Sequence, residues 1–168
     1  SYTVIGNPKK ATEAYDLAAA EQKLYQANGI DVDAELAMFQ ADQRRDLPAA
    51  LDAARRAVRD RGSVVSSDTL AWTLYQNGEY AEALKASDQA HRLGTRYAIF
   101  YFHSGMIKYR LGLLDAARAD LTEALSINPY FSLIHVPEAK STLAALGGSS
   151  SANPVVTGHL SLTHGGAP

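Results

Sequence analysis

The stretch Gly78-Glu79-Tyr80-Ala81-Glu82-Ala83 decides the fold, because Gly112-Leu113-Leu114-Asp115-Ala116-Ala117 repeats its pattern 34 residues further on. Ala90 and Ala124 follow seven residues after the last alanine of each stretch. A fixed period between 20 and 50 residues is typical of proteins built from stacked repeats. The sequence therefore predicts a stack of repeated units, and with it a binding scaffold whose partner the repeat does not name.

Composition limits the classes of protein and of site. The chain has 168 residues, 46% of them hydrophobic, which is enough for one domain with a core. Its net charge of −2 gives no general attraction to nucleic acid or anionic lipid. It has no cysteine, which excludes disulfides and zinc–thiolate sites. The chain has no apolar run of membrane-spanning length, and its start, Ser1 to Gly6, is unlike a signal peptide, so its compartment stays open.

Apolar residues at helical spacing predict three antiparallel helix pairs with short links. The predicted pairs are about 33–43 with 47–60, about 66–77 with 80–92, and about 98–111 with 114–126. A further helix is expected before them, over 11–27, and a short capping helix after them, over about 137–146. The chain then divides into an N-terminal helix region (1–30), three units (31–131, with bounds of about 31–63, 64–97 and 98–131), a capping helix (132–147) and a flexible Gly/Ser-rich tail (148–168).

From Asp31 to Phe131 this pattern resembles the tetratricopeptide repeat family, whose unit is a helix pair of 34 residues. The matching positions are a small residue in the first helix (Gly105, Ala71), a turn glycine (Gly78, Gly112, with Arg45 in the first unit), a large residue two positions on (Tyr80, Leu114, Leu47), a first alanine (Ala83, Ala117, Ala50), a second alanine (Ala90, Ala124, Ala57) and a closing proline (Pro129). The resemblance implies an all-α, right-handed superhelical solenoid with flanking helices. As a whole the chain is similar to the repeat regions of bacterial multi-repeat proteins.

In the family, the first helices of the pairs line a concave groove that binds peptides. Position by position, the resemblance places Phe39, Trp72 and Met106 at one inward site, Glu35, Asp68 and Phe102 at a second, and Asp42, Tyr75 and Tyr109 at a third, with His103 and Arg110 beside them. The expected peptide-binding groove is Glu35, Phe39, Asp68, Trp72, Tyr75, Phe102, His103, Met106, Tyr109 and Arg110. The alternative is that these side chains pack against neighbouring helices or the tail.

One ligand of this family is disfavoured by charge. Members that grip a C-terminal carboxylate use lysine, asparagine and arginine in the groove. Here the corresponding positions carry Glu35, Asp68, Phe39 and Trp72, so a carboxylate would meet like charge.

The sequence predicts no catalytic site, no metal site and no cofactor. It has no G-x-S-x-G, Walker or G-x-G-x-x-G motif, and no two histidines have the i, i+4 spacing of a zinc site. A cluster of arginines between Arg44 and Arg61 is interleaved with aspartates, which favours a solvated helix face over a nucleic-acid patch.

We therefore expect a protein or peptide as the partner, without nucleic acid or membrane insertion. Three alternatives stay open: a self-associating or spacer module of a larger repeat protein, a regulatory tail in which Leu160 and Leu162 fold back into the groove, and, less favoured, an enzyme with a site around His103.

Overall fold

A computed structural model describes residues 9–10, 12–14, 16–17, 20 and 33–149 of the chain. Within these residues the regular elements are all helices, which confirms the predicted all-α helical repeat fold. The helices are α2 (Asp33–Gln43), α3 (Leu47–Arg61), α4 (Val64–Gln76), α5 (Tyr80–His91), α6 (Ala98–Arg110), α7 (Leu114–Ile127) and α8 (His135–Ser149). Residues 9–10, 12–14, 16–17 and 20 are also helical. The rest of the helix expected over 11–27, and the tail from residue 150, lie outside the described residues.

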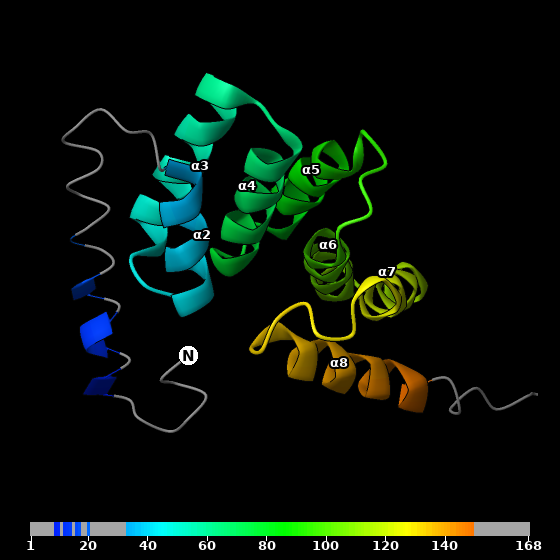
Figure 1. Cartoon of the computed structure of the whole chain (residues 1–168). Coiled ribbons are helices and arrows are strands. Elements are labelled where there is room, and N and C mark those ends of the chain that lie inside the picture. Colours follow the sequence, from blue (N-terminus) through cyan, green and yellow to red (C-terminus); the bar gives the residue numbers. More distant parts are fainter. Residues whose placement is uncertain (1–8, 11, 15, 18–19, 21–32, 150–168) are drawn as a thin grey trace, which may run out of the picture.

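The helices form three antiparallel pairs that follow one another along an arc from α2 to α8 (Figure 1). Within each pair, α2 packs on α3, α4 on α5 and α6 on α7. The first helices of neighbouring pairs are also in contact, α2 with α4 and α4 with α6. Helix α8 packs on α7 and α6, at the end of the stack. The short links cause this arrangement, because a link of a few residues leaves the next helix no path except back along its partner.

Alanines mark the seam inside each pair. Ala50, Ala83 and Ala117 are each 0% exposed, so all three methyl groups are buried. The second set of repeated alanines is also buried. Small side chains at these points let the two helix backbones approach closely.

Gly105 makes the closest approach in the third pair. A Cβ added to it would lie 2.7 Å from Leu121 Cγ, which is shorter than carbon–carbon contacts allow. The small residue that the repeat pattern requires in the first helix is thus explained by the Leu121 side chain that occupies the space.

The turns between the helices differ in one respect from the sequence alignment. Gly78 and Gly112 have φ values of 83° and 76°. The amide of each hydrogen-bonds to the carbonyl three residues before it, and the next amide to the carbonyl five residues before it. In the first pair Arg44 makes these bonds, with φ 51°, so Arg44 and not Arg45 is the equivalent of the glycines. A left-handed conformation costs a non-glycine residue about 1–2 kcal/mol.

The capping helix α8 starts two residues before the predicted start at Pro137. The Ser132 hydroxyl accepts hydrogen bonds from the amides of Ile134 (3.3 Å) and His135 (3.2 Å). Pro137 is tolerated because the first-turn amides of a helix have no intrahelical partner.

One continuous hydrophobic core runs through the stack, from Ala41 on α2 to Leu146 on α8. A smaller cluster of Ala37, Ala53 and Ala54 lies within the first pair. Among the described residues, no helix combines the length and the hydropathy that a membrane span requires.

Candidate functional site

A pocket of about 510 Å³ opens on the inner face of the stack, where the first helices of the three pairs meet. We call it the inner pocket. It is lined by Ala34, Glu35, Met38, Phe39 and Asp42 of α2, Val65, Asp68 and Thr69 of α4, Tyr97, Ile99, Phe100 and His103 at or near the start of α6, and Phe131, Ser132 and His135 at the start of α8 and in the link before it.

Four of the ten residues predicted for the groove line this pocket: Glu35, Phe39, Asp68 and His103. Glu35 is exposed and Phe39 half-buried, whereas Asp68 and His103 are 1% and 0% exposed and lie at the floor. The structure therefore brings together one residue or more from each of the three first helices.

Four other predicted groove residues are buried: Trp72, Tyr75, Phe102 and Met106. They do not form an open surface in this structure, because they belong to the main core. The expectation that they are accessible to a peptide is corrected in this respect, and their burial fits the alternative in which they pack against neighbouring helices.

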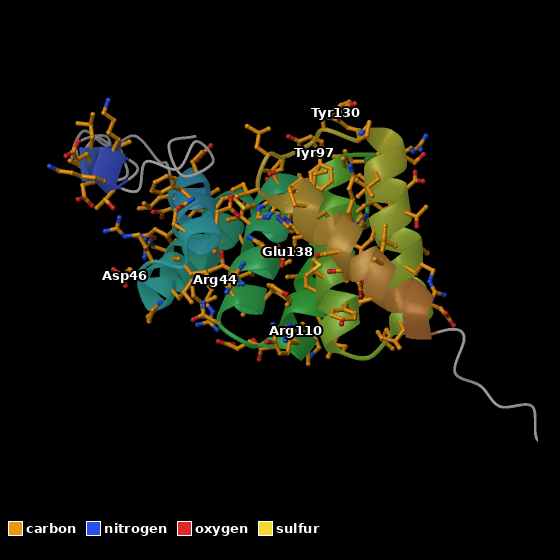
Figure 2. The ribbon with its side chains drawn as sticks, turned by 90° about the horizontal axis from the view of Figure 1, so that it is seen from below. Arg44, Asp46, Tyr97, Arg110, Tyr130 and Glu138 are labelled. Carbon is orange, nitrogen blue, oxygen red and sulfur yellow. The ribbon has the colours of Figure 1, made fainter. Side chains whose placement is uncertain are left out.

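The last two predicted residues lie at the opposite end of the first helices. Tyr109 is half-buried, and the exposed Arg110 places its guanidinium 5.8 Å from the centre of the Tyr80 ring. Figure 2 shows Arg110 at one edge of the molecule, with Tyr97, which lines the inner pocket, at the opposite edge. The ten predicted residues are thus distributed over two ends and a closed middle.

Trp72 is the centre of the closed middle. Its ring stacks on the ring of Tyr75, with 4.7 Å between centroids, and on the ring of His103, with 4.3 Å between centroids. Its indole Nε1–H donates a hydrogen bond to Asp42 Oδ1 at 2.8 Å. Tryptophan is commonly buried only where its N–H finds such an acceptor.

Asp42 also accepts from His135, which sequence reasoning missed. His135 Nε2 lies 3.1 Å from Asp42 Oδ1, and its Nδ1 lies 3.8 Å from Glu138 Oε2. Burial of the ring lowers the pKa of His135, but the hydrogen bonds and charges of Asp42 and Glu138 outweigh burial and raise this pKa to about 9. The imidazolium is therefore the favoured form at neutral pH, and it ties the start of α8 to α2. No periodicity connects two residues so far apart in the sequence, which is why no local signal identified the pair.

A second buried pair forms the floor of the inner pocket. The Nδ1–H of His103 donates to Asp68 Oδ2 at 2.9 Å, since a carboxylate oxygen accepts. Asp68 Oδ1 and His103 Nε2 are buried, and neither has a hydrogen-bond partner among the described residues. Unpaired buried polar atoms are uncommon in native proteins, and they point to a missing partner.

The described part of the chain holds no group of three histidine or acidic side chains arranged to bind a metal ion. The carboxylate and imidazole groups that line the inner pocket are the two pairs above and the exposed Glu35, and Thr69, Tyr97 and Ser132 add hydroxyl groups.

Comparison with known proteins supports the repeat. Residues 98–131 match the sequence model described as "Tetratricopeptide repeat". Comparison with curated proteins finds no match. Among solved structures, the chain is similar to the NMR structure of the first TPR domain of the human RPAP3 protein, with 19% identity and a TM-score of 0.55. That similarity covers 70% of this chain and 94% of the other.

At 19% identity the similarity to this domain concerns the fold alone. The bacterial origin expected from the sequence stays a prediction. The matched segment is the third helix pair, α6 and α7, which contains the repeat positions Gly105, Gly112 and Ala117. Residues 98–131 therefore match the tetratricopeptide repeat, and the chain has the fold of a tetratricopeptide repeat domain.

Proposed function

We propose that this chain is a non-catalytic scaffold that binds a protein or peptide on the inner face of its helix stack. We also propose the division expected from the sequence, in which 31–131 form three repeats and 132–147 form the cap. The single observation that carries the function is the inner pocket, a hollow lined by all three first helices in a fold that generally serves protein interaction.

Uncovered apolar side chains around the pocket support this proposal. Val65 and Tyr97 line it and are 54% and 56% exposed. Leu133 and Ile134, in the link beside it, are also exposed. Apolar side chains next to a concave pocket are typical of an interaction surface.

The arginines between Arg44 and Arg61 support a protein partner over a nucleic acid. Arg56 makes two hydrogen bonds to Asp33, of 2.8 and 3.1 Å, and Arg55 lies 3.6 Å from Glu79. Arg59 lies 3.3 Å from Asp60. Carboxylates thus offset much of the positive charge on this surface, as expected for a solvated helix face.

The test is affinity capture with the purified full chain and two variants. Val65→Arg puts a long charged side chain at the pocket, and Leu93→Arg puts the same side chain at an exposed position outside the pocket. We expect the wild type and Leu93→Arg to retain a protein that Val65→Arg does not retain. If every retained protein binds all three equally, the inner pocket is not the binding site and the proposal is wrong.

Self-association is distinguished by sedimentation of the same three proteins. A dimer that forms with the wild type and Leu93→Arg, and is absent with Val65→Arg, would make a second copy of the chain the partner. A monomer at all concentrations excludes the self-association alternative.

A further inference from the structure

We propose that the inner pocket receives a basic side chain, arginine or lysine, from a peptide that docks on the inner face. The inference rests on the proposed function and gives the chemistry of the partner: a peptide with a cationic anchor among apolar residues.

The first observation is the charge of the residues that line the pocket. Glu35, Asp42 and Asp68 contribute three carboxylates, and none of the lining residues is a lysine or an arginine. Asp42 is paired with His135. Asp68 pairs with the imidazole of His103, and Glu35 is exposed at the pocket. The pocket therefore keeps an excess of negative charge that a cation would neutralise.

The second observation is an unpartnered carboxylate oxygen at the floor. Asp68 Oδ1 is a buried carboxylate oxygen, and it accepts no hydrogen bond from the described residues, because the Nδ1–H of His103 is directed to Oδ2. This oxygen therefore needs a donor. Guanidinium carries five N–H donors and ammonium three, and neither carries an acceptor. A carboxylate ligand would bring two more acceptors to a site that already lacks donors.

The third observation is the wall of the pocket, which is aromatic. Phe39, Tyr97, Phe100 and Phe131 all line it. Aromatic rings attract a cation over their faces and also pack against the methylene groups of a long basic side chain. Tyr130, which is 85% exposed and precedes the pocket residue Phe131 in the sequence, lies at the same edge of the molecule as Tyr97 (Figure 2), so this edge offers apolar area to the residues that flank the anchor.

The first step of the test is selection of short random peptides, displayed on phage, on the immobilised full chain. Peptides are kept if they bind the wild type and Leu93→Arg but not Val65→Arg. We expect these pocket-dependent peptides to be enriched in arginine or lysine flanked by apolar residues. Their affinity should fall as salt is added, because charge attraction is screened.

The second step uses one selected peptide, labelled for fluorescence anisotropy, and its copy with citrulline in place of the arginine. Citrulline keeps the shape and removes the charge, and we expect binding to weaken by about tenfold or more. In the protein, Asp68→Asn and Glu35→Gln should each lower the affinity for the arginine peptide and leave the affinity for the citrulline peptide nearly unchanged. The matched control is Asp88→Asn on the exposed surface of α5, which should change neither affinity.

The outcomes separate the two proposals. If no peptide depends on the pocket, the proposed function fails. The basic anchor is overturned if the pocket-dependent peptides are acidic or wholly apolar, or if the citrulline peptide binds as tightly as the arginine peptide. In both cases the proposal of peptide binding stands. Asp68 is buried, so Asn at this position could affect folding. Glu35 is exposed, and unchanged arginine affinity in the folded Glu35→Gln variant would also overturn the anchor.

Discussion

The inner face of this helix stack has a closed half and an open half, although the repeat pattern treats both alike. Trp72 and Met106 occupy equivalent inward positions in the closed half, where each is less than 5% exposed. Met38 lies six residues before Arg44, as Trp72 and Met106 lie six residues before Gly78 and Gly112, so it and not the predicted Phe39 is their equivalent in the first unit. Met38 lines the inner pocket and is half-buried. A position in the repeat therefore determines which way a side chain points, but not whether anything covers it.

The cover comes from α8 and the link before it. Phe131 and His135 pack on Phe102, at 5.6 and 4.8 Å between ring centroids. Further along α8, the Thr142 hydroxyl lies 3.7 Å from Met106 Sδ. The capping helix thus fills the part of the groove next to the last pair and leaves the part between α2, α4 and the start of α6 open.

The largest effect is expected for Trp72→Ala, which tests whether the closed half of the inner face is a packed core. Removing a fully buried tryptophan leaves a large cavity, and we expect the free energy of unfolding to fall by about 3–5 kcal/mol. Urea denaturation followed by circular dichroism measures this loss. Trp72 is the only tryptophan of the chain, so its fluorescence cannot be the probe in the variant.

The control for this measurement is Tyr130→Ala. This aromatic side chain is 85% exposed, and we expect a change within about 0.5 kcal/mol. If Trp72→Ala costs no more than Tyr130→Ala, the middle of the inner face is not a packed core, and the groove expected from the repeat pattern would be open throughout.

The second prediction concerns His135, which joins the two halves. The charged groups that face it are Asp42 from α2 and Glu138 from its own helix, and His103 of α6 lies 6.1 Å away between ring centroids. Its folded-state pKa, about 9, exceeds the unfolded value of 6.5. The added stability is therefore complete below pH 6.5 and is lost as pH rises to 9, and it amounts to about 3 kcal/mol. Urea denaturation across this range measures it.

The comparison variant is His135→Gln, which cannot take up the proton. We expect it to be less stable than the wild type below pH 6.5, and we expect the difference between the two proteins to shrink towards pH 9. Parallel pH profiles of wild type and variant would show that α8 is not held by the charge of this histidine.

The repeat and its helices could be predicted because their signals are local. Alanines that recur after 33 and then 34 residues predict the register of the pairs, and Ala50, Ala83 and Ala117 are all buried, as this register requires. The errors are at the ends of helices. Helix α4 starts at Val64 and not at residue 66, because Ser63 and Ser66 cap it reciprocally, each side chain accepting from the amide of the other.

The state of the inner face could not be predicted, because it depends on contacts between distant parts of the chain. His135 and Asp42 are separated by 93 positions, and no helical period links them. His103 was recognised as a groove residue, but its partner Asp68 was expected at a different inward position of another unit. A repeat pattern aligns equivalent positions, whereas the Asp68–His103 pair joins positions that are not equivalent.

The smallest predicted effect tests the open half directly. Val65→Ala shortens a side chain that is 54% exposed at the pocket, and we expect the free energy of unfolding to change by no more than about 0.5 kcal/mol. The measurement is the same urea titration, here read by the fluorescence of Trp72. A loss of more than about 1 kcal/mol would mean that Val65 is covered in solution, since truncation of an exposed side chain creates no cavity. The surface around Val65 would then be covered like the closed half, and the ligand would have to bind outside the inner face.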